Sequence, residues 1–112
     1  MGEFMQGFYN VFWTGDDEFG AFGVLLHQGR IYAIDREGGE FTGTYKERGD
    51  GGADVALTYT PVPSIGTNGQ PSIDPPINAD FLLSASTFAG GYQEVNLPTG
   101  KFNVKLVKRV TV

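Results

Sequence analysis

Residues 19–35 read Phe-Gly-Ala-Phe-Gly-Val-Leu-Leu-His-Gln-Gly-Arg-Ile-Tyr-Ala-Ile-Asp, and this stretch decides the fold. Two short apolar runs, residues 20–27 and 30–35, flank the dipeptide Gln28-Gly29. Because a two-residue turn with glycine between alternating runs is the strongest local signal of a β-hairpin, we predict two antiparallel strands here. The side chains that share one face of the first strand are Phe22, Val24 and Leu26.

Weaker copies of the same alternation occupy most of the remaining chain. Further strands are expected at residues 7–13, 41–46, 53–59, 78–86, 92–97 and 102–107. No segment has a convincing apolar period of 3.6 residues, so we expect little helix. About eight short strands joined by hairpins predict an all-β, antiparallel, up-and-down barrel, because closure removes exposed sheet edges.

The segment 61–76 contains five of the six prolines and interrupts the alternation. Proline lacks the N–H that a central strand donates, so this segment is predicted as a long Pro-rich loop. Two interpretations stay open: a lid over one end of the barrel, anchored by Ile65, Ile73 and Ile77, or a plain connection that seals the core.

The composition bounds the domain organisation. The 112 residues suffice for one core, and 40% apolar with 13% aromatic residues predict a folded domain. Met5 offers a second start, which leaves open whether residues 1–4 are native. Residues 1–6 are therefore treated as an N-terminal segment, and residues 7–112 as a single β-barrel domain.

Charge and hydropathy exclude several partners. Eight basic against thirteen acidic residues give a net charge of −5, which would repel a phosphate backbone, so we expect no direct nucleic-acid binding. The chain lacks the apolar run of roughly 20 residues that a membrane span requires. It also lacks the basic and then apolar start of a leader, so we expect a cytoplasmic protein with no membrane span.

The residue types of catalysis and metal binding are sparse. There is no cysteine, and His27 is the only histidine, without a serine in a recognisable nucleophile turn nearby. Glu37 and Glu40 lie in a glycine turn, where nothing buries them to raise a pKa. We therefore predict a protein that is not an enzyme and that binds neither a metal nor a cofactor.

Several short motifs, in order and spacing, resemble the first half of the small negative regulators of bacterial type III secretion. Members of this family open with a Gly-aromatic-Tyr strand, followed by a Gly-Val strand, a Gly-x-Ile turn, an aspartate and an aromatic-x-Gly-x-Tyr strand. The matching residues are Gly7-Phe8-Tyr9, Gly20, Gly23-Val24-Leu25, Gly29-Arg30-Ile31, Asp35 and Gly43-Thr44-Tyr45.

This resemblance implies a calycin-like or lipocalin-like barrel that forms a homodimer and acts by protein contact. It further implies transcription regulation, because the best-known member restrains a helix-turn-helix transcriptional activator through consecutive acidic residues on a surface loop. Residues 47–54 correspond to that loop, but Arg48 and glycines interrupt the acids. The predicted partner-binding residues are the three acids that remain, Glu47, Asp50 and Asp54.

Two further expectations come from the residues themselves. The strand at residues 7–13 has aromatic side chains on both faces, which favours a homodimer. The alternative to a regulator is a carrier or sensor of a small apolar ligand, because a barrel of eight strands either fills its interior or encloses one small molecule. The candidate ligand-lining residues are Phe22, Val24, Leu57, Phe81 and Leu83.

Overall fold

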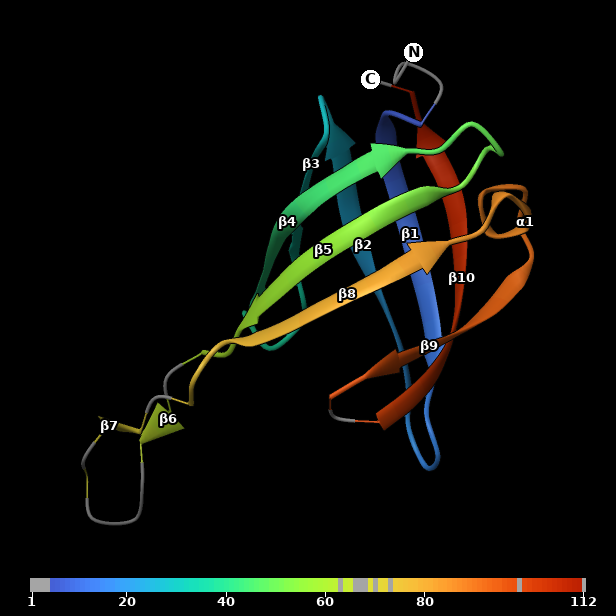
Figure 1. The fold of residues 1–112 in the computed structure, drawn as a ribbon. Coiled ribbons are helices and arrows are strands. Elements are labelled where there is room, and N and C mark those ends of the chain that lie inside the picture. The colour runs from blue at the N-terminus through green and yellow to red at the C-terminus, as the bar shows by residue number, and fades with distance from the viewer. Residues whose placement is uncertain are drawn as a thin grey trace.

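The computed structural model describes residues 5–62, 64–65, 69, 71–72, 74–98 and 100–111. The strands are β1 (Gly7–Thr14), β2 (Phe19–His27), β3 (Arg30–Ile34), β4 (Glu40–Glu47), β5 (Ala53–Thr60), β6 (Ser64–Ile65), β7 (Pro71–Ser72), β8 (Ile77–Leu83), β9 (Tyr92–Leu97) and β10 (Gly100–Val110). The single helix in these ranges is α1 (Ala85–Phe88). Eight strands form one antiparallel sheet that rolls into a nearly closed barrel, which confirms the predicted fold class (Figure 1).

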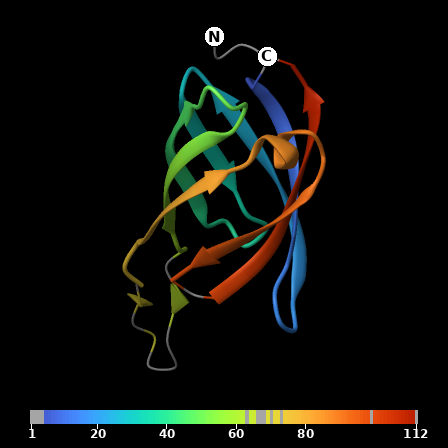
Figure 2. The ribbon, with the colours of Figure 1, turned by 45° about the vertical axis from the view of Figure 1, so that its right-hand side comes forward.

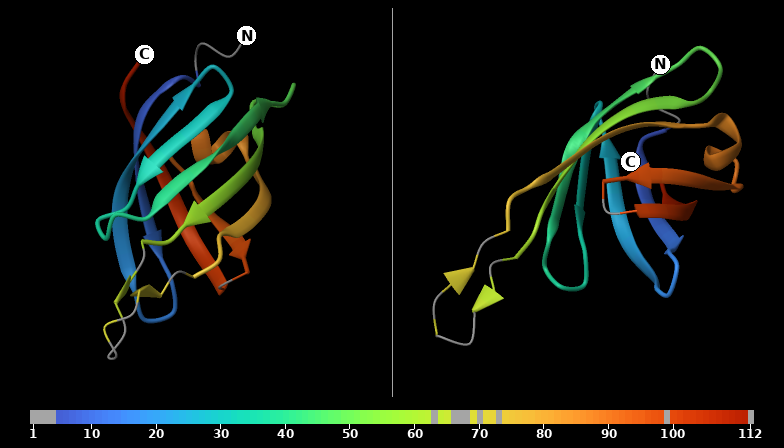
Figure 3. Two further views of the ribbon diagram at one scale, coloured as in Figure 1. Left: turned by 90° about the vertical axis from the view of Figure 1, so that its left-hand side faces the viewer. Right: turned by 60° about the horizontal axis from the view of Figure 1, so that its bottom comes forward.

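The strand order around the barrel is β8-β5-β4-β3-β2-β1-β10-β9, while β6 pairs with β7 alone. Consecutive strands pair from β1 to β5, as an up-and-down barrel requires. The first and last strands, β1 and β10, lie side by side in the wall (Figures 2 and 3). The barrel therefore depends on one pairing between strands about a hundred residues apart in the chain.

The predicted hairpin at residues 19–35 is present as β2 and β3. Gln28 and Gly29 form its turn with φ angles of 50° and 78°. Positive φ at both central residues is the geometry that matches the twist of the flanking strands. The turn also accepts a hydrogen bond from outside the hairpin, because Tyr45 N donates to Gly29 O at 2.9 Å.

One predicted strand is too long. The strand expected at residues 78–86 ends at Leu83, and Ser84 instead caps α1, accepting a hydrogen bond from the N–H of Thr87 at 3.3 Å. Serine favours this position because its hydroxyl replaces a missing backbone acceptor. The lid interpretation of residues 61–76 rests partly on Ile73, which lies outside the described residues; Ile77 begins β8.

The core follows the alternation of the strands. Tyr9 and Val11 of β1 lie beside Val24 and Leu26 of the neighbouring strand β2 on the inner side of the wall, and all four are buried. Met5 is fully buried against them, and Tyr9 Oη donates to Met5 O at 2.7 Å. Burial, with a smaller contribution from neighbouring Tyr45, raises the pKa of Tyr9 to about 12. The other buried core residues are Ile31, Ala33, Tyr45, Ala53, Val55 and Leu106.

Gly20 is required by a close approach. A Cβ atom there would lie 2.8 Å from the indole ring of Trp13, which packs edge to face on Phe102 with ring centroids 5.7 Å apart. Gly23 differs, because a Cβ atom at that position would meet nothing within 4 Å. A close approach therefore requires glycine at position 20 but not at position 23.

The barrel closes differently between its edge strands, β8 and β9. In the described chain no backbone ladder joins these two strands, and we call the junction the seam. The Gln93 side chain of β9 crosses it: Oε1 accepts from Ser84 N at 2.9 Å and from Thr87 Oγ1 at 2.6 Å, while Nε2 donates to Leu82 O. Helix α1 lies where the chain turns from β8 into β9 (Figure 2).

Candidate functional site

The outer surface of β1, β2 and β3 carries an exposed apolar face. Cross-strand pairing lines up three outward rows, which are Phe8–Leu25–Tyr32, Asn10–Gly23–Ile34 and Phe12–Ala21. We call these eight residues the outer face. Phe8 is 48% exposed, Phe12 43%, Tyr32 45% and Ile34 63%.

None of the eight residues of the outer face carries a charge. Single exposed apolar residues are ordinary on a protein surface, but contiguous ones mark a site of contact with another protein. The predicted two-faced aromatic pattern of the first strand is present, since Tyr9 and Val11 point into the core while Phe8 and Phe12 point out. The face is thus a candidate protein-binding surface.

The predicted acidic residues lie at the hairpin between β4 and β5. Arg48 sits among them, with its guanidinium 3.5 Å from Asp50 Oδ2 and 3.2 Å from Asp54 Oδ1. The Gly52 N–H, which donates to Asp50 Oδ1 at 2.9 Å, is the main cause of the lowered pKa of Asp50, with Arg48 contributing less. Glu47 ends β4 and takes no part in this cluster.

These ion pairs change what the loop offers to a partner. Exposed pairs add little to stability, but Arg48 neutralises part of the negative charge of the two aspartates. The sequence contains a signal for this arrangement, because the hairpin pairs Lys46 with Asp54 and places Arg48, two residues further on, diagonally from Asp54. Arg48, which interrupts the acidic run in the sequence, is thus the counterion of Asp50 and Asp54 in the structure.

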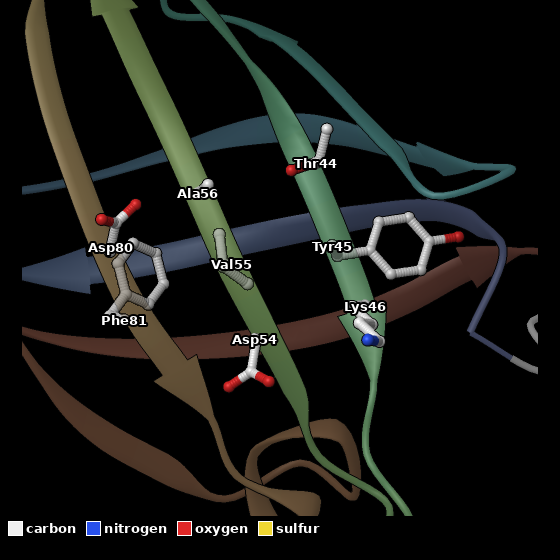
Figure 4. A pocket seen from close by; sticks show the side chains of 8 residues that line it. All are labelled: Thr44, Tyr45, Lys46, Asp54, Val55, Ala56, Asp80 and Phe81. Carbon is white, nitrogen blue, oxygen red and sulfur yellow. The ribbon is translucent and has the colours of Figure 1, made fainter.

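An open depression of about 520 Å³ lies next to this loop, on the outer surface of β4, β5 and β8 (Figure 4). The cross-strand row Thr44–Ala56–Asp80 and the pair Lys46–Asp54 supply its outward side chains. Tyr45, Val55 and Phe81 also line it, although they alternate to the interior side of the same strands. Its charged groups are the carboxylates of Asp54 and Asp80 and the ammonium of Lys46, which suit the polar side chains of a protein surface.

The five predicted ligand-lining residues all face the barrel interior. Val24 is buried in the core, and the other four are half-buried and pack against it. The Phe22 ring stacks on the Phe41 ring with centroids 5.0 Å apart. The centroids of the Phe41 and Tyr59 rings are 4.7 Å apart. All five residues thus belong to, or pack against, the one hydrophobic cluster of the core.

A network of hydrogen bonds around the Asp35 carboxylate links the β3–β4 turn to β5. Asp35 Oδ2 accepts from Tyr59 Oη at 2.7 Å, while Oδ1 accepts from the N–H groups of Glu37 and Gly39. Partial burial works to raise the pKa of Asp35, but these hydrogen bonds, led by that from Tyr59, lower it below its ordinary value. The hydrogen bond to Asp35, burial and the charge of Asp35 raise the pKa of Tyr59 to about 12.

Comparisons with protein-family models, with curated proteins and with solved structures each found no match for this chain. The resemblance to negative regulators of type III secretion therefore stays a prediction. Within the described ranges, no helix has the length and apolar character to cross a membrane. Across the same residues, no three acidic or histidine side chains gather as a metal site.

Proposed function

We propose that this chain is a non-enzymatic regulatory or adaptor protein that acts by contact with other proteins. The observation that carries the proposal is the outer face, whose four large apolar side chains remain exposed on one side of the barrel. The resemblance to negative regulators of type III secretion supports the same function. Its partner would then be a helix-turn-helix transcriptional activator, in a bacterial cytoplasm.

A second copy of the chain is the proposed occupant of the outer face. Large aromatic side chains offer roughly 150–250 Å² each when fully exposed, so Phe8, Phe12 and Tyr32, with the smaller but more exposed Ile34, supply somewhat under about 400 Å². That is just under half of the about 800 Å² per partner that a stable interface buries. The smaller members Leu25 and Ala21, together with Val107, which pairs with Asn10, add to this area. A two-fold homodimer would bury the same face on both copies.

The homodimer is tested by its sedimentation mass at micromolar concentration. Replacing two members of the face together, Phe12→Ser with Ile34→Ser, should convert a dimer to a monomer. Leu82→Ser is the matched control, because Leu82 is 41% exposed on β8, which lies three strands away from β3 in the sheet. A monomeric wild-type protein would contradict the dimer.

The acidic loop is the proposed contact for the activator, through Glu47, Asp50 and Asp54. Tagged protein is captured from its own cells, and everything retained is identified by intact mass. A basic DNA-binding protein in defined stoichiometry is expected. The triple variant Glu47→Ala/Asp50→Ala/Asp54→Ala should retain less of it, and Arg48→Ala should retain more, because two carboxylates lose their counterion. Equal retention by all variants would show that the loop is not the contact.

The second candidate function is a carrier or sensor of a small apolar ligand. It is favoured by the half-buried state of Phe22, Leu57, Phe81 and Leu83, which pack against the core and yet keep part of their surface accessible. The same capture experiment distinguishes the two functions. A retained lipid or other small molecule, without a protein partner, would support the carrier and count against the regulator.

A further inference from the structure

The edge strand β8 lacks the features that usually protect a sheet edge. Proteins block free edges with lysine, proline, a bulge or an inward-pointing charge. β8 reads Ile-Asn-Ala-Asp-Phe-Leu-Leu and contains none of these, and its pairing with β5 is regular over its whole length. The lysines of the C-terminal region lie on β10, which is paired on both sides.

The direction of the ladder groups on β8 follows from the seam. The Leu82 carbonyl accepts from Gln93 Nε2, so it points away from β5 and toward β9. Alternate residues of a strand direct their N–H and C=O groups to the same side. The N–H and C=O groups of Asn78 and Asp80 therefore face the seam too, where no strand of the described chain pairs with them.

The side chains around this edge define what could pair with it. Asp80 on β8 and Glu94 on β9 are exposed on the outer side, and β5, β8 and β9 contain no lysine or arginine. On the inner side, Ala79 and Phe81 are half-buried and apolar. An added strand would thus meet apolar surface with one set of alternate side chains and carboxylates with the other.

We propose that the β8 edge binds an extended segment of a partner protein in which apolar residues alternate with lysine or arginine. The segment pairs with the seam-facing groups of Asn78 and Asp80 by strand addition. The inference rests on the proposed action by protein contact. Its surface is separate from the outer face and adjoins the acidic loop, since Asp80 and Asp54 line the same depression.

The probe is an eight-residue peptide of alternating valine and lysine, blocked at both ends and added to the isotope-labelled chain. Binding should slow hydrogen exchange of the Asn78 and Asp80 amides about tenfold. Asp80→Pro removes one seam-facing N–H without touching the ladder to β5, and should weaken binding about tenfold. Asp80→Ala is the matched control, because it keeps the N–H and loses only an exposed charge, which is worth about two- to threefold.

Equal binding to wild type and Asp80→Pro, or protection confined to other strands, would overturn the proposal. The amide spectrum shows whether Asp80→Pro is folded, and Asn78→Pro provides the same test if it is not. A peptide of alternating valine and glutamate should bind about tenfold more weakly, because Asp80 and Glu94 repel it; equal binding would contradict the basic partner. Since the probe is synthetic, its result is independent of whether the chain captures a regulator from cells.

Discussion

Two junctions in the barrel wall, β1–β10 and β8–β9, are built in different ways. β1 and β10 are joined by a ladder from Phe8–Val110 to Thr14–Asn103, interrupted by one register shift, whereas β8 and β9 are linked through the side chain of Gln93. A ladder consists of many backbone hydrogen bonds, and these do not depend on the identity of any one side chain. A link through one side chain depends on that residue alone, so we expect the barrel to open first at the seam.

The largest expected effect lies at the β1–β10 junction. Leu106 of β10 is buried opposite Val11, so Leu106→Ala should lower the free energy of unfolding by about 3 kcal/mol through lost burial and a residual cavity. Equilibrium urea unfolding measures the change. Val107→Ala, at a neighbouring outward and half-buried position, should cost less than about 1 kcal/mol. Equal costs would mean that inward packing does not hold this junction.

The next effect lies at the seam. Gln93→Ala removes the acceptor of Ser84 N and Thr87 Oγ1 together with the donor to Leu82 O. Because Thr87 is fully buried, its hydroxyl loses one partner where water cannot replace it. We expect a cost of about 2 kcal/mol and faster hydrogen exchange in α1 and the adjoining ends of β8 and β9.

Gln93→Glu is the matched control for this prediction. It keeps an acceptor for Ser84 N and Thr87 Oγ1 but has no donor for Leu82 O, so its effect should be intermediate. In Gln93→Ala, hydrogen exchange should accelerate in α1 and not in the β1–β10 ladder. An equal acceleration in both places would contradict the difference between the two junctions. That outcome would mean that the seam opens only together with the whole barrel.

The difference between the junctions also explains what could be predicted from the sequence. Strand ladders follow from alternation, which is why the hairpin at residues 19–35 and the eight-stranded barrel were predicted and confirmed. The side-chain link across the seam does not follow from alternation. Gln93 alternates with Val95 and Leu97 on the inward face of β9, a polar exception whose partners only the assembled barrel supplies.

Some features of the candidate surfaces could likewise be predicted from strand alternation, and others could not. The outward positions of Phe8 and Phe12 follow from alternation in β1, and Tyr32 and Ile34 follow from alternation in β3. The ion pairs of Arg48 depend on the register of a hairpin loop, and the predicted extension of β8 to residue 86 ignored the capping ability of Ser84. Period-two patterns therefore predict which face a residue occupies, but not which side chains bind one another.

The smallest expected effect tests a side-chain link between strands that a ladder already joins. Tyr59 and Asp35 are hydrogen-bonded at 2.7 Å, but β4 and β5 also pair from Glu40–Thr60 to Glu47–Ala53. Tyr59→Phe should therefore cost less than about 1 kcal/mol at neutral pH, below the cost of Gln93→Ala, although each removes a side-chain link.

The pH dependence identifies the bond responsible. Asp35 has a lowered pKa in the folded chain, so its contribution is present above the ordinary value of 3.8 and is lost as the pH falls through the lowered pKa. Tyr59 has a pKa raised to about 12, so its contribution is present below the ordinary value of 10.0 and is lost as the pH rises toward 12. The stability difference between wild type and Tyr59→Phe should shrink in both windows, as measured by urea unfolding across pH. A difference that stayed constant with pH would assign the effect to packing against Phe41, and a cost equal to that of Gln93→Ala would mean that the ladder does not compensate for a lost side-chain link.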